Sequence, residues 1–229
     1  MADAAAEPTL PLVAPVGLPP VEDSAKEQSK AQLIAAIAVL PRALMTGVAF
    51  AIYYFAFKES ATKATEKLLA FNEHIGYWYL AALAFSWIVW FQNFYPINWE
   101  PGVFAKDVGA LRTNMFVFKT LSPEKPSYVA LEYDGHVGSY NRANRGLYHT
   151  LEYAPIMMVN FLMTGPVFPV CVFGTVALYA VGRFAYQYGS AHKGWPSGTG
   201  PGFMLSNVLA MNLCEGFTIV TTLKLMGVL

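Results

Sequence analysis

Long stretches without a charged side chain constrain this chain more than any other feature. Thirty consecutive residues, 153–182, contain no Asp, Glu, Lys or Arg, and a second uncharged stretch covers 75–99. Charged residues make up only 13% of the sequence, whereas about 25% is usual for a soluble domain. Too few charges are available to coat a water-facing surface. Most of the chain is therefore predicted to face lipid.

Five segments are long enough to cross a bilayer, which takes about 20 predominantly apolar residues. The 153–182 stretch is too long for one span, and Gly165, Pro166 and Pro169 break it where a turn is needed. Aromatic side chains gather at both ends of the 75–99 segment, as two membrane interfaces select. The predicted spans are 33–57, 75–99, 142–164, 170–188 and 203–226.

The remaining segments have distinct compositions. Residues 1–30 are predicted to be disordered, because the first 25 are rich in Ala and Pro and contain four acidic but no basic residues. The stretch 96–140 is expected to be an ordered loop that caps one face. With five spans, seven Lys and Arg residues lie on the side of the N-terminus and four on the other. The positive-inside rule then predicts a cytosolic N-terminus.

Several function classes are excluded at this stage. The formal net charge is zero, and binding to nucleic acid requires a basic excess that neutralises phosphates. Cys171 and Cys214 both lie within apolar runs, so they supply neither a disulfide framework nor a zinc cluster.

Ionisable residues at membrane depth are costly and indicate function by default. Arg142, Arg145, His149 and Glu152 fall within about 80° of one another on one helix face, and Tyr153 borders that face. The next predicted helix carries a second stripe, made of Tyr179, Arg183, Tyr186 and Ser190. Two polar stripes on successive spans imply a shared interior site or a subunit interface.

Two interpretations of these charges are open. Arg145 with Glu152, and Arg183 with Glu215, could form ion pairs that only hold helices together. Ion pairs that only hold helices together do not require three arginines, a histidine and several tyrosines near one end of the bundle. These side chains favour an anionic ligand of peptide size, because an Arg fork pairs a carboxylate bidentately. No metal is expected, since His149 and Glu152 supply two ligands where three or four are required.

The two stripes carry motifs that resemble a known family. The run NRANRGLYHTLEYAP at 141–155 resembles the second-helix signature of the membrane-associated proteins in eicosanoid and glutathione metabolism (MAPEG), an Arg followed by Asn four residues later and Glu three beyond that. Arg145 and Glu152 match it, and His149 stands at the Asn position. The run VGRFAYQYG at 181–189 resembles the motif of the type 3 microsomal glutathione transferase subgroup.

The resemblance covers roughly residues 75–226 and implies both fold and activity. The implied fold is an all-α integral membrane protein, in which residues 75–229 form a MAPEG-like four-helix bundle and 31–60 an additional N-terminal transmembrane helix. The implied protein is a homotrimer in a lipid bilayer, most naturally that of the endoplasmic reticulum. Glutathione would be its co-substrate, bound between subunits near the cytosolic face. The implied activity is that of a glutathione transferase or peroxidase acting on lipophilic electrophiles or lipid hydroperoxides.

Site residues are carried over from the matched motifs. The expected glutathione-binding residues are Arg142, Arg145, His149, Glu152, Tyr153, Arg183 and Tyr186. Arg145 and Arg183 would hold the two carboxylates, Glu152 the amino group and Tyr186 the sulfur. Arg183 and Tyr186 are the expected catalytic residues.

One departure keeps other functions open. The family places an Arg shortly after the third-helix motif to stabilise the glutathione thiolate, and this chain has no arginine after Arg183. Lowering a thiol pKa by two units takes about 2.7 kcal/mol. The absence of this arginine therefore affects catalysis more than binding. The alternatives are a non-catalytic binding or scaffold protein with the same bundle, or a subunit of a larger membrane complex that docks through the additional helix.

His149 carries a separate expectation. If its imidazole lies close to Glu152, the carboxylate favours the charged imidazolium. Glutathione binding would then tighten as the pH falls toward about 6.

Overall fold

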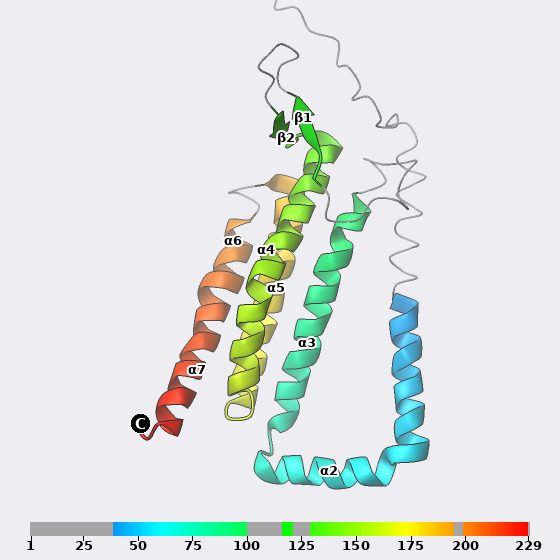
Figure 1. The fold of residues 1–229 in the computed structure, drawn as a ribbon, viewed down its shortest axis with the longest axis vertical. Coiled ribbons are helices and arrows are strands. Elements are labelled where there is room, and N and C mark those ends of the chain that lie inside the picture. Colours follow the sequence, from blue (N-terminus) through cyan, green and yellow to red (C-terminus); the bar gives the residue numbers. More distant parts are fainter. Residues whose placement is uncertain (1–38, 100–115, 121–128, 195–198, 229) are drawn as a thin grey trace, which may run out of the picture.

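The structure, a computed structural model, describes residues 39–99, 116–120, 129–194 and 199–228 (Figure 1). Five helices dominate this part of the chain. The first is described from residue 39 and continues through the π-helical turn Tyr53–Phe57 into α2 (Lys58–Phe71). The next three are α3 (Ile75–Phe94), which is extended by the 3-10 turn Tyr95–Asn98, α4 (Gly135–Thr164) and α5 (Pro169–Lys193). The last begins as α6 (Gly200–Phe203) and continues through the π-helical segment Met204–Met211 into α7 (Asn212–Leu225). The segment predicted to be disordered, 1–30, lies outside the described residues.

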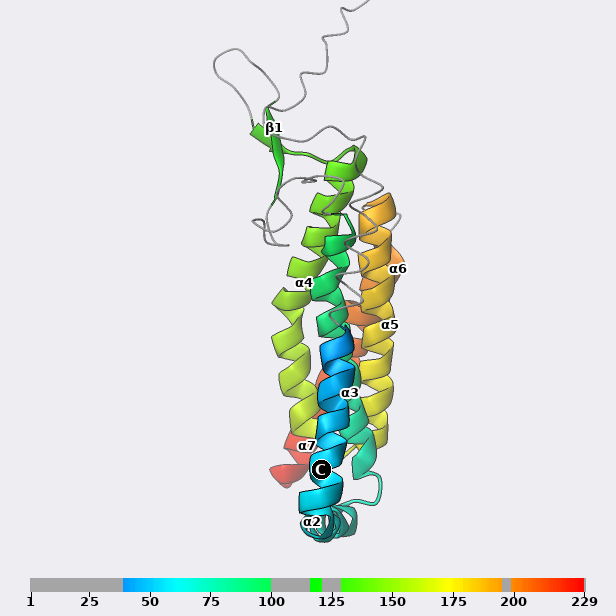
Figure 2. The same ribbon diagram turned by 90° about the vertical axis from the view of Figure 1, so that its right-hand side faces the viewer.

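Four of these helical units run side by side as a bundle: α3, α4, α5 and the α6–α7 unit (Figures 1 and 2). The predicted break between two spans is confirmed, because α4 ends at Thr164 and α5 begins at Pro169. Proline fits the first helical position, where its missing N–H would have no partner in any case. The short turn therefore makes α4 and α5 antiparallel neighbours.

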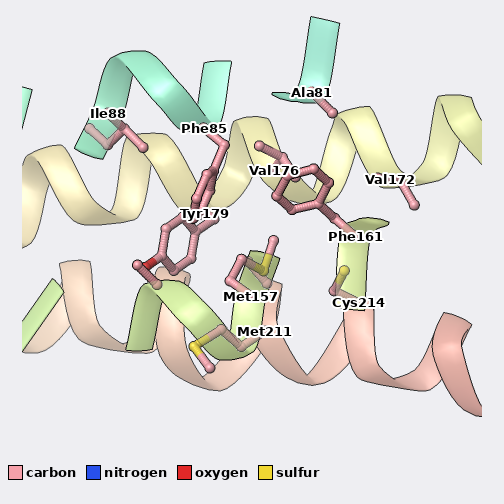
Figure 3. Close-up of a cluster of buried hydrophobic side chains, with 12 residues drawn as sticks. Ala81, Phe85, Ile88, Met157, Phe161, Val172, Val176, Tyr179, Met211 and Cys214 are labelled. Carbon is pink, nitrogen blue, oxygen red and sulfur yellow. The ribbon is translucent and has the colours of Figure 1, made fainter. Parts of the chain in front are cut away.

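Apolar side chains from all four units meet in one core (Figure 3). The ring of Phe85 on α3 lies 5.2 Å from that of Phe161 on α4 and 6.1 Å from that of Tyr179 on α5, between centroids. Met157 and Cys214 are fully buried beside them. The core therefore fixes the four helices relative to one another below the polar stripes.

Within the described residues, four helices are long and apolar enough to cross a membrane: Val39–Phe71, Ile75–Ile97, Pro169–Lys193 and Gly200–Leu225. The expected span 142–164 is not among them. It lies within the 30-residue helix α4, about 45 Å long, which begins seven residues earlier at Gly135 and carries buried polar residues that include Asn144 and Thr150. The chain is an integral, multi-pass membrane protein, and α4 owes its place in the bundle to packing rather than to its own hydropathy.

The first helix changes direction at its end. Phe57, the predicted end of the first span, leaves helical geometry with φ −124° and ψ 4°. Beyond it α2 runs across the end of the bundle, roughly perpendicular to the other helices (Figure 1). The sequence analysis had assigned no helix there. No side chain of α2 is buried.

Near the other end of the first helix, the Arg42 guanidinium lies 4.9 Å from the ring centroids of both Trp87 and Trp90 on α3.

The connection between α3 and α4 contributes a small antiparallel sheet at the opposite end of the bundle from α2. Strand β1 (Phe118–Thr120) pairs with β2 (Val129–Leu131), with Phe118 opposite Leu131. Asn141 on α4 holds this segment: its Nδ2 donates to the carbonyls of Val117 and Glu132, each at 2.7 Å. The rest of the predicted capping loop, 100–115 and 121–128, lies outside the described residues.

Candidate functional site

The predicted site residues divide into two groups in the structure. One group, from α4 and α5, lies together in the bundle interior: His149, Tyr153, Arg183 and Tyr186. The other group, Arg142, Arg145 and Glu152, lies along α4 around the first. The polar stripes predicted on these two helices therefore do face one another.

Arg183 is at the centre of the first group. Its side chain is fully buried. One terminal nitrogen, Nη1, is hydrogen-bonded to His149 Nδ1 at 2.7 Å, and the other, Nη2, donates to Asn207 Oδ1 at 2.6 Å. Its backbone carbonyl accepts a hydrogen bond from Gln92 Nε2 at 3.0 Å. Hydrogen bonds from two other helical units thus fix the guanidinium, and a third unit, α3, holds the backbone of Arg183.

Aromatic rings surround this guanidinium. Its central carbon lies 5.2 Å from the ring centroid of Tyr179, 5.6 Å from that of Tyr153 and 5.7 Å from that of Tyr186. The alternative in which Glu215 neutralises Arg183 is wrong, because Glu215 is exposed on α7 and Arg183 bonds to His149 and Asn207 instead. Among the described residues, no carboxylate forms an ion pair with Arg183. A buried cation without a counterion is costly, so this site is suited to an anion.

Arg145 and Glu152 do form the predicted ion pair. Arg145 Nη1 lies 3.1 Å from Glu152 Oε1, and the two side chains are 57% and 49% exposed. Half-exposed charges exchange partners at small cost, because the net gain from such a pair is at most about 1 kcal/mol in water. Both groups therefore remain available to a ligand.

His149 forms its hydrogen bond with a partner that the sequence analysis did not expect, Arg183. A guanidinium can only donate hydrogen bonds, so His149 Nδ1 accepts the bond from Arg183 Nη1. If that nitrogen were protonated, its N–H would face the N–H of Arg183, and neither group could accept the hydrogen bond. The ring also stacks on Tyr186, with centroids 4.8 Å apart and 22° between the planes. The imidazole is therefore neutral here, and the expected tightening of binding through a charged His149 is opposed by this geometry.

A pH titration tests this correction. Between about pH 6 and pH 7.5, the glutathione affinities of the wild type and of His149→Asn should follow the same curve, since Asn can still accept a bond from Arg183. His149→Phe removes the acceptor and should weaken binding about tenfold at every pH. A wild-type affinity that rises on acidification, with a flat profile in His149→Asn, would show that the imidazole becomes charged after all.

Arg142 is engaged in holding the structure together. Its Nε donates to the Ser190 carbonyl at 3.1 Å, and its Nη2 donates to the Ala191 carbonyl and to Ser139 Oγ, each at 3.0 Å. Its Nη1 donates to the Tyr133 carbonyl. The carbonyls in the last turn of a helix lack partners within the helix and favour a cation. Arg142 thus fastens α4 to the C-terminal end of α5.

A cavity of about 270 Å³ opens beside these residues. It is lined by Leu131, Tyr133, Asn141, Arg142, Arg145, Tyr186, Ser190 and Thr199. Thr199 is only 2% exposed, and its hydroxyl has no hydrogen-bond partner among the described residues. The cavity therefore combines cationic, hydroxyl and aromatic groups in one place.

Two residues of the interior were missed by the sequence analysis, Asn207 and Gln92. Both are amides within otherwise apolar segments, and both are buried against Arg183. The signal that could have found them is the same one that identified the arginines, a polar side chain at membrane depth. In the described part of the chain, no three His, Cys, Asp or Glu side chains gather closely enough to hold a metal ion.

Comparison with known proteins finds one family that this region of the chain resembles. Residues 103–215 match the model of the MAPEG family. That range contains both motifs and every predicted site residue. No curated protein matches the chain, and no solved structure does. Members of the family are mostly glutathione-dependent membrane enzymes. Residues 103–215 of this integral membrane protein are therefore similar to the MAPEG family.

Proposed function

We propose that this chain is a membrane-bound glutathione transferase or peroxidase that acts on lipophilic electrophiles or lipid hydroperoxides. The observation that supports this most strongly is the fully buried Arg183, held by neutral acceptors and tyrosine rings with no paired carboxylate in the described part of the chain. Such a cation calls for an anionic ligand. Glutathione carries two carboxylates and is the ligand typical of the family.

The proposed roles follow the contacts. Arg183 and Arg145 hold the two carboxylates, with Arg145 turning from Glu152 to the ligand, and Glu152 then takes the amino group. Tyr186, which lines the cavity and lies next to Arg183, donates a hydrogen bond from its hydroxyl to the sulfur and so stabilises the thiolate. His149 and Tyr153 shape the pocket around them. Arg142 contributes indirectly, by fastening α4 to the C-terminal end of α5.

The proposal extends to assembly and location. The Arg145–Glu152 pair is half-exposed in the single chain, as expected if a neighbouring subunit completes the glutathione site. We propose a homotrimer of the type 3 microsomal glutathione transferase kind, in the endoplasmic reticulum membrane, with residues 75–229 as the catalytic domain and 31–60 as an added transmembrane helix.

Calorimetric titration of the purified protein with glutathione, paired with thiolate difference spectroscopy, tests this function. The wild type should bind glutathione and develop thiolate absorbance. Tyr186→Phe should bind glutathione within about threefold of the wild type but lose most of the thiolate signal, because one hydrogen bond to a charged group is worth about 1.5–3 kcal/mol. Arg145→Ala should abolish conjugation of a standard electrophile. Absence of binding by an intact oligomer would refute the proposal.

A second candidate is a binding protein that no longer turns over. The absence of any arginine after Arg183 favours it, because a thiol without a strong cationic partner remains mostly protonated at neutral pH. This candidate predicts glutathione binding without thiolate absorbance. The same titration therefore separates the two functions.

A further inference from the structure

We infer that Asn207 is a positioning residue for Arg183: it fixes the guanidinium through a neutral acceptor, so that the positive charge stays available to a carboxylate of the ligand. This inference rests on the proposed function. It concerns a residue outside both motifs, on the π-helical segment Met204–Met211 that precedes α7.

The contact is direct and shielded from solvent. Asn207 Oδ1 accepts from Arg183 Nη2 at 2.6 Å and from Ser206 Oγ at 2.9 Å. Asn207 is 9% exposed and Arg183 is fully buried. Short hydrogen bonds from a charged donor are among the strongest in proteins. With His149 on Nη1, Asn207 on Nη2 holds both ends of the guanidinium in one plane.

The backbone is arranged to bring Asn207 this close. A Cβ on Gly182 would lie 2.6 Å from the backbone nitrogen of Ser206, and a Cβ on Gly202 would lie 2.3 Å from that of Tyr186. Only glycine allows α5 and the 200–211 segment to approach to this distance. Wide π-helical turns such as this one are rare and often occur at functional sites. The segment therefore aims Asn207 at Arg183.

The neutrality of the acceptor is the property that matters. A carboxylate at this position would also accept from Nη2, but it would cancel the charge of Arg183 and compete with an incoming anion. An amide holds the same geometry without that competition. The Nδ2 donor of Asn207 also has no acceptor among the described residues, and a buried donor without a partner carries a desolvation cost. A carboxylate bound against Arg183 supplies the missing acceptor.

The variant Asn207→Asp keeps the size and the acceptor and adds the charge. Its matched control is Asn160→Asp. Asn160 on α4 also accepts a hydrogen bond across the bundle, from Thr218 Oγ1 on α7 at 2.9 Å, but it is not hydrogen-bonded to Arg183 or His149. Calorimetry with full-length protein should compare glutathione with glutathione esterified at both carboxylates. The ratio of the two affinities reports how strongly the site prefers a charged ligand.

The expected results differ between the variants. The wild type and Asn160→Asp should prefer free glutathione to the diester by about tenfold or more, as one or two charge-assisted bonds imply. Asn207→Asp should lose that preference, with about tenfold weaker glutathione binding and an unfolding midpoint no lower than that of the wild type. A merely structural role would lower the midpoint and leave the ratio unchanged.

A second substitution keeps the test decisive if the aspartate variant does not fold. Asn207→Leu removes the acceptor without adding charge, so it should weaken glutathione binding while the preference over the diester persists. Wild-type glutathione affinity in Asn207→Leu, or an unchanged ratio in Asn207→Asp, would overturn this inference but leave the proposed function standing. A wild-type protein that binds no glutathione would overturn the proposed function and this inference with it.

Discussion

Arg183→Gln is expected to lower glutathione affinity by about a hundredfold or more, because it removes the two charge-assisted hydrogen bonds that we propose Arg183 makes to a ligand carboxylate. The unfolding midpoint in detergent should stay the same or rise, since a buried cation without a counterion is removed from the interior. Loss of binding without loss of stability is the distinctive result. Calorimetry and thermal unfolding on the same preparation measure both.

Two variants control this experiment. Arg183→Lys keeps the charge but not the planar fork, so it should bind glutathione with intermediate affinity. Arg42→Gln removes another arginine from the membrane region, one that stacks on Trp87 and Trp90 away from the site, and should leave glutathione binding unchanged. If Arg183→Gln binds glutathione within about threefold of the wild-type affinity, Arg183 does not contact the ligand.

Gly202→Ala is expected to damage both stability and binding. The added Cβ would lie 2.3 Å from the Tyr186 backbone nitrogen and 2.7 Å from the Gly182 carbonyl oxygen. Backbone atoms cannot move aside as a flexible side chain can, so α5 and the 200–211 segment must separate. Overpacking of this kind costs about 1–3 kcal/mol. The separation should also lengthen the Arg183–Asn207 bond and weaken glutathione binding about tenfold.

Gly216→Ala provides the matched comparison. Gly216 lies on α7, and a Cβ there meets no atom within 4 Å. Replacing glycine by alanine within a helix then stabilises by about 0.5–1 kcal/mol, so the unfolding midpoint should rise slightly and binding should not change. Equal behaviour of Gly202→Ala and Gly216→Ala would mean that the helices tolerate a wider spacing at the site.

The placement of the helices follows closely from the sequence, for one reason. Charge cannot enter the bilayer cheaply, so charged residues and Gly–Pro clusters mark where spans end. This pattern located α3, α5 and the α6–α7 unit to within a few residues. It failed for α2, whose alternating charged and small residues show no long apolar run. That helix begins directly after the bend at Phe57.

The sequence by itself determined which helix faces carry polar residues, because the helical period alone puts Arg145, His149 and Glu152 on one side. It could not determine how those residues pair. Arg183 bonds to His149 and Asn207 rather than to Glu215, and Arg142 binds the end of α5. Such pairing depends on the rotation and spacing of neighbouring helices, and these are set by core packing and by the glycine contacts at Gly182 and Gly202. Only the tertiary structure decides that, because it brings together residues far apart in the chain.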